Sequence, residues 1–399
     1  MSSVILGVPL DDVTESGALD VIHALVIDGR ETGRSHQVTT VNVDFVVNAT
    51  RRPELLPILQ RSSLNVADGA PLVWLSSVFG EKVSERVAGA DLFKAFAAGS
   101  VDRGWRIHVL GGAPGVGDRA LEILLGTYPG AQITVDPGPV FDDPRDVPSE
   151  VLDDIVARAP DVLCVALGNP KQELFIDAHR ERLGCPVMIG VGGSMDMLVG
   201  DRRRAPRWMQ RMGAEWIFRA VQEPRRLGPR YLSDLRAFVP AIARQTRDIR
   251  YFAEHGRDIE IRRRGDAVIA SPVRSLRLAG GDGVIVPRSP EWADLLVCDR
   301  PVHIDLAGCD SLTPSGHGAV CALVRLAGRF GQTLTVVGWS DSLRACFDRY
   351  GTGDWIDDVI GATRAAEDES IPEPDPTTRP PHPATAIAEN DVVRGTDDV

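Results

Sequence analysis

The sequence predicts an α/β protein built on a mostly parallel sheet, followed by a helical segment and a second, smaller α/β unit. Residues 1–200 alternate short apolar runs with helix-like segments, which is the pattern of parallel strands joined by crossover helices. Two buried apolar runs, 162–167 and 186–191, each end in a polar or Gly-rich loop. In such sheets the ligand site lies at the strand ends, so these loops mark the candidate site.

The apolar runs and their flanking residues place the individual elements. Strands are predicted at 38–43, 105–110, 133–135, 162–167 and 186–191, and helices at 44–49, 71–79, from 116, 153–157 and 172–183. Residues 205–250 are predicted to be helical, with Pro224, Pro229 and Pro240 breaking them into pieces. The predicted domains are 1–200, the helical segment 201–254, an α/β unit at 255–361 and a disordered, acidic, Pro-rich tail at 362–399.

Composition and charge limit the classes of function. The six cysteines show no CxxC pairing, so we interpret them as reduced thiols of a cytosolic protein. The first residues do not form a signal peptide, and no apolar run approaches the roughly 20 residues that span a bilayer, so any membrane contact is expected to be peripheral. The net charge of −12 argues against general nucleic-acid binding, although residues 201–250 hold thirteen Arg against five acidic residues.

The motifs at the predicted strand ends resemble the WecG/TagA/CpsF family of glycosyltransferases. The resemblance covers roughly residues 35–235 and rests on TVNVDFVVNA, NVADGAPLVW, ERVAGADLF, VLGGAPGVG, LGNPKQE, IGVGGSMDMLVG, RAPRWMQRMGAEW and QEPRRLGPRYL, in family order. It implies a Rossmann-like domain with a helical appendage at the membrane. It also implies transfer of a sugar, typically N-acetylmannosamine from its UDP donor, to a lipid-linked precursor of a bacterial surface polymer.

Asp68 is the candidate catalytic base. Inverting sugar transfer needs a group that removes the proton of the acceptor hydroxyl, and a carboxylate at a strand–helix junction can do so. The aspartate of the family's ADG motif has this proposed role, whereas the alternative is that Asp68 only caps the following helix. Thr40 and Asn42 match the family's T-x-N motif, which implies a position near the donor sugar or its phosphate. Without the resemblance, Thr40 is an ordinary strand residue.

Arg86 is the candidate for stabilising the departing UDP, because a fixed guanidinium can neutralise developing negative charge. The alternative is a solvated surface arginine. Gly111 and Gly112 follow a strand and precede a helix, so their backbone N–H groups could bind a phosphate or ribose, or simply form a tight turn. Because Pro114 interrupts the glycine pattern, a nicotinamide-dependent oxidoreductase is disfavoured.

The PKQE run and the following glycine loop contribute further candidates. The resemblance places the run along the nucleotide-sugar pocket, with Gln172 as the residue that contacts sugar or uracil. Lys171 could equally be a surface lysine at a helix start. Gly192 and Gly193 could allow the backbone to approach a ligand closely. The alternative is that glycine is needed there only because the backbone adopts a positive φ.

The Arg-rich segment has two functional interpretations. Its arginines could grip the donor or acceptor diphosphate; these are Arg219, Arg225, Arg226 and Arg230. Trp208, Met212 and Trp216 recur every four residues and could face a lipid headgroup layer. The alternative is a helix docked on the protein's own core. No DxD motif occurs in residues 1–250, and the resembled family is metal-independent, so no metal and no cofactor are expected.

Residues 255–361 resemble a STAS domain, the fold of bacterial anti-sigma factor antagonists. The predicted order is the strand VHIDL, a helix over 318–328, the strand TLTVVG and a last helix. Ser315 occupies the position of the family's phosphorylatable serine, but Thr313-Pro314 replaces the usual acidic-serine pair. We therefore expect a module for docking or self-association rather than a phosphorylation switch, with catalysis independent of it.

The sequence thus predicts a cytoplasmic, membrane-peripheral, inverting glycosyltransferase. Its predicted partners are a UDP-sugar donor, carrying N-acetylmannosamine or a related hexosamine, a polyprenyl-diphosphate-linked acceptor and the inner face of the cytoplasmic membrane. The alternative is a non-catalytic interaction protein that senses nucleotide sugars and acts through its STAS-like domain.

Overall fold

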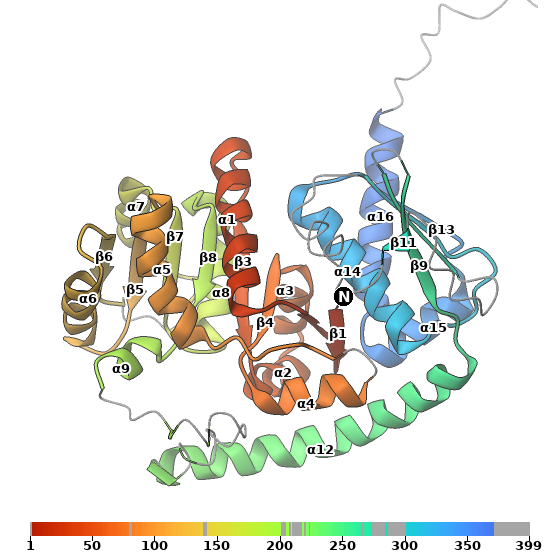
Figure 1. Cartoon of the computed structure of the whole chain (residues 1–399), viewed down its shortest axis with the longest axis horizontal. Coiled ribbons are helices and arrows are strands. Elements are labelled where there is room, and N and C mark those ends of the chain that lie inside the picture. Colours follow the sequence, from red (N-terminus) through yellow and green to blue (C-terminus); the bar gives the residue numbers. More distant parts are fainter. Residues whose placement is uncertain are drawn as a thin grey trace, which may run out of the picture.

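The computed structural model (Figure 1) describes most of the chain up to residue 370. The described residues are 2–79, 82–138, 142–200, 205–206, 209, 218, 221–222, 224–264, 267–272, 284–285 and 301–370. Among them no helix is both long and apolar enough to cross a membrane. Trp208, Met212 and Trp216, the predicted lipid-facing stripe, lie outside the described residues.

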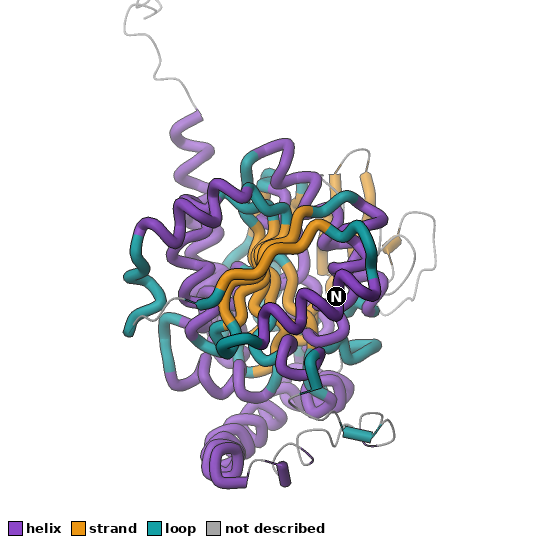
Figure 2. The backbone as a smooth tube through the Cα atoms, turned by 90° about the vertical axis from the view of Figure 1, so that its left-hand side faces the viewer, coloured by secondary structure: helices purple, strands orange, loops and turns teal. Residues whose placement is uncertain are grey.

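The first sheet has six parallel strands in the order β4-β3-β8-β7-β5-β6. This confirms the predicted α/β fold with a mostly parallel sheet. Figure 2 shows the strands stacked with a twist and with helices on both sides. The strands are β3 (His36–Val41), β4 (Leu64–Ala67), β5 (Arg106–Gly111), β6 (Gln132–Asp136), β7 (Val162–Ala166) and β8 (Val187–Gly190).

The helices of this domain fall on the two faces of the sheet. Residues of β7 alternate between two apolar clusters, because successive side chains of a strand point to opposite faces: Cys164 packs with α1, α5 and α6, and Leu163 packs with α7 and α8. These helices are α1 (Glu15–Thr32), α5 (Gly89–Arg103), α6 (Val116–Thr127), α7 (Ser149–Arg158) and α8 (Lys171–Leu183). The shorter helices are α2 (Val43–Arg51), α3 (Leu55–Arg61), α4 (Ala70–Val78) and α9 (Ser194–Leu198).

Helix α12 (Pro224–His255) is one continuous helix, so the prediction that prolines break this segment is wrong. Pro224 begins the helix, where a missing N–H costs nothing. Pro229 and Pro240 lie inside it, and both are exposed, as are Arg225 and Arg236 four residues before them. The carbonyl groups that lose their helical donors therefore lie on the solvent side, where water can satisfy them. In Figure 1 the helix runs beneath both halves of the molecule.

The C-terminal residues form a second sheet in the order β11-β9-β10-β12-β13. Its strands are β9 (Ile259–Arg264), β10 (Ala267–Pro272), β11 (Val284–Ile285), β12 (Val302–Asp305) and β13 (Leu334–Val337), and its helices are α14 (Pro314–Phe330), α15 (Asp341–Tyr350) and α16 (Gly353–Ser370). The predicted strand–helix–strand–helix unit is present as β12, α14, β13 and α15. Ser315 lies in the first turn of α14, which Thr313 caps by accepting a hydrogen bond from Gly316 N. Helix α16 continues to Ser370, so the prediction of disorder from 362 begins too early.

The second sheet does not stand apart from the first domain. Helix α14 packs against the hairpin of β1 (Ser2–Ile5) and β2 (Val8–Asp11) and against α3. Arg325 on α14 is buried and forms an ion pair with Asp11 (Nη1–Oδ2, 3.0 Å), and its Nε and Nη2 donate to Ser62 O at 3.2 and 2.6 Å. Arg329 donates from Nε to Ser63 O at 2.8 Å. This packing argues against catalysis being independent of residues 255–399.

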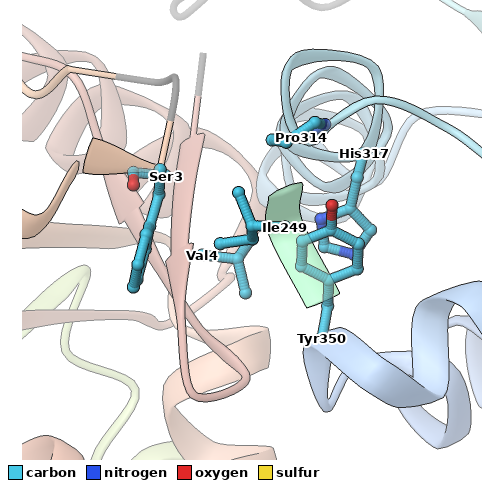
Figure 3. A pocket seen from close by; sticks show the side chains of 7 residues that line it. Ser3, Val4, Ile249, Pro314, His317 and Tyr350 are labelled. Atoms are coloured by element: carbon cyan, nitrogen blue, oxygen red, sulfur yellow. The ribbon is translucent and has the colours of Figure 1, made fainter. Parts of the chain in front are cut away.

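A small cavity marks the place where these parts meet (Figure 3). Ser3 and Val4 on β1, Ile249 on α12, His317 on α14 and Tyr350 on α15 line it. The His317 ring stacks on Tyr350 with centroids 3.9 Å apart and is hydrogen-bonded to Thr352 Oγ1 through Nε2 at 2.8 Å. Burial lowers the pKa of His317 to about 3, so the ring is neutral and serves as packing.

Candidate functional site

A cleft of about 790 Å³ opens at the carboxyl ends of the parallel strands. The chain reaches it within two residues of the end of each of five strands: at Asn42 after β3, Asp68 after β4, Gly112 after β5, Gly168 after β7 and Gly192 after β8. This is the location that the topology of an open α/β sheet favours for a ligand. The residues predicted from sequence that line the cleft are Thr40, Asn42, Asp68, Arg86, Gly112, Gln172, Gly192, Gly193 and Arg230.

Asp68 lies between a helix N-terminus and an arginine. Its backbone N donates to Val41 O at 2.7 Å, which ties the residue to the end of the neighbouring strand. Its Oδ2 accepts from Gly89 N at 3.1 Å, at the start of α5, and Arg86 Nη1 lies 4.0 Å from Oδ1. Gly69, not Asp68, occupies the N-cap position of α4. The N-terminus of α5 and the Arg86 guanidinium therefore both place positive charge beside this carboxyl group.

Thr40 and Asn42 also reach the cleft, but both have protein partners. Thr40 Oγ1 donates to Gly190 O at 3.4 Å, across to the neighbouring strand β8. Asn42 Oδ1 accepts from Asp44 N and Phe45 N at 3.0 and 3.3 Å, so Asn42 is the N-cap residue of α2. The predicted strand 38–43 therefore ends earlier, at Val41, and Asn42 holds the helix that follows.

Gln172 ties two glycine loops together at the back of the cleft. Its side chain is buried, and its Oε1 accepts from both Gly168 N and Gly192 N at 3.1 Å. Its Nε2 donates to Glu173 Oε1 at 2.8 Å, which fixes the orientation of the amide. Gln172 therefore positions the two loops in addition to lining the cleft.

Glu173 extends this network towards α2. Its Oε2 accepts from Asn169 Nδ2 at 2.8 Å, and Asn169 Oδ1 accepts from Asn48 Nδ2 at 2.6 Å. Burial raises the pKa of Glu173 to about 7, although both amide donors oppose the rise, and the charge of Asp44 adds to it. The carboxyl group is thus poised to change protonation near neutral pH.

Helix α12 closes one side of the cleft through ion pairs to α2. The Arg230 guanidinium pairs with the Asp44 carboxylate, with Nε 2.8 Å from Oδ1. Arg51 Nη1 lies 3.1 Å from Asp234 Oδ1, and burial raises the pKa of Asp234. At this edge an arginine of α12 therefore pairs with an acidic residue of α2, and an acidic residue of α12 pairs with an arginine of α2.

The remaining predicted residues lie elsewhere. Lys171 and Arg225 are exposed and are not among the residues that line the cleft. Gly111 belongs to β5 with φ of 106°, and a Cβ there would lie 2.9 Å from Ala166 O, so this glycine serves strand packing. Arg219 and the side chain of Arg226 lie outside the described residues.

Several cleft residues were not predicted from the sequence. Asp44, Asn169, Asp234, Trp74 and Leu235 line the cleft without having been singled out. One signal was available: Asp44 and Asn48 lie four residues apart after a helix cap, so they share one face of α2. The α12 residues gave no such signal, because their position depends on how that helix folds back.

The fold and cleft define an open, parallel α/β protein with a ligand site at the strand ends. The chain belongs to the glycosyl transferase WecG/TagA/CpsF family, whose model matches residues 3–251, and it is a glycosyltransferase. It is 30% identical over 210 residues to an N-acetylglucosaminyldiphosphoundecaprenol N-acetyl-beta-D-mannosaminyltransferase of Bacillus spizizenii, covering 53% of this chain and 79% of that protein. It is 28% identical over 246 residues to a protein of the same name from Staphylococcus aureus, covering 62% of this chain and 94% of that protein.

The raised pKa of Glu173 predicts a specific pH dependence of stability. A carboxyl group with a raised folded-state pKa stabilises the fold fully below its unfolded pKa and loses that contribution as pH rises through about 7. Glu173→Gln has no titrating carboxyl group at this position, so it does not lose stability in this way. The free energy of unfolding of the variant should therefore rise relative to that of the unsubstituted protein between about pH 4.5 and pH 7. Urea unfolding at several pH values measures the difference. A difference in the free energy of unfolding that stays constant across this pH range would contradict the prediction.

Proposed function

We propose that the protein is an inverting glycosyltransferase that moves N-acetylmannosamine, or a related hexosamine, from a UDP donor to a polyprenyl-diphosphate-linked acceptor in bacterial surface-polysaccharide synthesis. The observation that carries the proposal is the Asp68 carboxylate, 4.0 Å from Arg86 in a cleft at the strand ends. The activity for which the relatives are named supports the acceptor class and the sugar.

Asp68 acts as the general base in this proposal. The carboxylate takes the proton of the acceptor hydroxyl as that oxygen attacks the anomeric carbon of the donor sugar. The bond from the anomeric carbon to the UDP oxygen breaks on the opposite face, so the configuration inverts and UDP leaves with its electron pair. The hydrogen bond from Gly89 N holds Oδ2 in place, and the other oxygen, Oδ1, lies 4.0 Å from Arg86 Nη1.

Arginines supply the positive charge for the leaving diphosphate, without a metal, in this proposal. Arg86, in the loop before α5, and Arg230, on α12, both line the cleft. Arg230 is paired with Asp44, so a diphosphate would compete with that carboxylate for the guanidinium. The glycine loops at Gly112 and Gly192 present backbone to the ligand at positive φ of 99° and 48°.

The direct test is transfer itself. Full-length protein should release UDP from UDP-N-acetylmannosamine only when a lipid-linked acceptor with an N-acetylglucosamine diphosphate head is present. A sensor without catalysis would bind the donor and raise the melting temperature but release no UDP. Donor binding with no turnover on any such acceptor would reject the proposal and leave the sensor interpretation.

Peripheral membrane association is a further part of the proposal. Residues 201–250 carry a net charge of +8 next to the cleft, which favours anionic headgroups. Full-length protein should co-sediment with anionic vesicles at low salt and be released as salt shortens the Debye length. Neutral vesicles are the matched control. Equal binding to both, or none to either, would contradict the electrostatic attachment.

A further inference from the structure

Two helices at the mouth of the cleft expose large apolar side chains in stripes. On α4, Trp74 and Val78 are one turn apart and are 54% and 60% exposed. On α12, the stripe consists of Leu232, Leu235 and Val239, which are 50%, 46% and 56% exposed. The spacing of three and four residues puts each set on one face of its helix. Such an arrangement differs from single exposed apolar residues, which need no explanation.

Both stripes are continuous with the cleft. Trp74 from α4 and Leu235 from α12 line the same cleft as Asp68. Phe238 also lines it and is buried in the apolar cluster that contains Leu72 of α4, so both helices contribute to one apolar cluster. An apolar group that leaves the cleft on this side would therefore pass from Trp74 and Leu235 to the outer residues of each stripe.

The order of side chains along α12 matches the order of groups in a lipid diphosphate. Arg230 faces the cleft and suits a diphosphate, and Leu235 and Val239 follow on the same helix. At 1.5 Å per residue, Leu235 lies about 7 Å along the axis from Arg230, and Val239 lies about 6 Å further. A diphosphate followed by the first isoprene units spans a comparable length, with its charge and its apolar part in this sequence.

We propose that the stripes of α4 and α12 form the binding site for the first isoprene units of the acceptor's polyprenyl chain. The inference rests on the proposed function, because it assumes a lipid-linked acceptor. The chain lies between Trp74 and Leu235 as it leaves the cleft and continues over Val78 and Val239. The sugar head then lies at Asp68, and the diphosphate lies near Arg230.

The experiment compares acceptors of different chain length. Two acceptors share the N-acetylglucosamine diphosphate head and carry either an undecaprenyl chain or a short, water-soluble alkyl chain. The variant is Val78→Gln with Val239→Gln, two stripe residues that do not line the cleft, and the matched control is Ile123→Gln on α6, which is 40% exposed and is also not a cleft residue. Both binding of each acceptor and its kcat/KM are measured on full-length protein in the same detergent.

If the proposal is correct, the double variant loses binding and activity only with the long-chain acceptor. Binding and kcat/KM for the undecaprenyl acceptor should fall at least about tenfold, mainly through KM, while the short acceptor and the control variant show no change. Equal losses with both acceptors, or no loss with either, would overturn the proposal. If the variant keeps its preference for the long chain but binds acceptor-free vesicles more weakly, the stripes contact the bilayer surface instead. This result would also overturn the proposal.

The binding measurements separate this inference from the proposed function. If the unsubstituted protein binds the long acceptor more tightly than the short one but transfers no sugar, the function fails and the chain site stands. If transfer occurs and the variant keeps its chain preference, the function stands and the chain site fails. Equal melting temperatures of variant and unsubstituted protein confirm that the two exposed substitutions leave the fold intact.

Discussion

Asp68→Asn should lower turnover at least about a hundredfold while leaving donor binding nearly unchanged. General bases contribute roughly 10²–10⁴-fold, and the substitution removes basicity while keeping the shape of the side chain. The amide oxygen of asparagine can still accept from Gly89 N, so the start of α5 keeps its partner. Steady-state transfer and calorimetric donor binding on the same preparation measure the two effects separately.

The matched control is Asp196→Asn, which removes another carboxylate from the same cleft. Asp196 lies in the first turn of α9, lines the cleft and has no part in the proposed proton transfer. Its turnover should change far less than that of Asp68→Asn. Retained turnover in Asp68→Asn would exclude Asp68 as the base, and equal losses in both variants would point to the charge of the cleft rather than to one proton acceptor.

The position of the site could be predicted because the local sequence motifs and the topology of the parallel sheet both place it at the strand ends. The apolar runs that form β3, β5, β7 and β8 each precede a polar or glycine-rich motif, and parallel strands bring those motifs to one edge. This pattern therefore predicted the position of the glycine loops, whereas Asp68 and Arg86 were supported by the family resemblance, because no strand was predicted at 64–67, where β4 lies. Helix ends differed by a few residues because caps such as Asn42 depend on hydrogen bonds that apolar patterning does not encode.

The part of the site that comes from α12 could not be predicted in the same way. Pro229 and Pro240 indicated helix breaks, but their freed carbonyls lie on an exposed face and the helix continues. Whether Arg230 pairs with Asp44 depends on how a helix nearly 190 residues away in sequence folds back over α2. Similarly, Gln172 looked like a ligand residue, and only the fold shows that it also joins two loops.

The position of the C-terminal unit was the largest difference from expectation. The sequence separates 255–361 by a change of composition, which is typical of an independent domain. In the structure, Gln60 Nε2 donates to both Gly7 O and Gly351 O, so one side chain joins the hairpin turn to the loop after α15. Gln245 of α12 likewise bonds to Val4 and Leu6. Contacts of this kind leave no pattern in the sequence, because each partner is an ordinary polar residue.

Arg325→Ala should destabilise the whole protein by about 3–5 kcal/mol, because it leaves a buried carboxylate without its cation. The Arg325 and Asp11 side chains are 1% and 4% exposed, and Asp11 Oδ2 also accepts from Asn65 N at 2.8 Å, which holds the carboxylate in place. The Ser62 carbonyl loses two donors in the same variant. Chemical unfolding should show the loss in a transition that includes the first domain.

Two companion variants show whether the buried pair, and not the substitution as such, causes the loss. Arg182→Ala breaks an exposed pair with Asp153 and should cost no more than about 1 kcal/mol. Arg325→Met combined with Asp11→Leu removes both charges of the pair but also takes the Asp11 charge away from buried Arg329, so it should recover only part of the stability. If Arg325→Ala unfolds only residues after 255 and leaves the first domain and its sugar transfer unchanged, the C-terminal unit is an independent module. The structure instead predicts that transfer is lost together with the fold, because α14 covers the hairpin on which β4 and α3 pack.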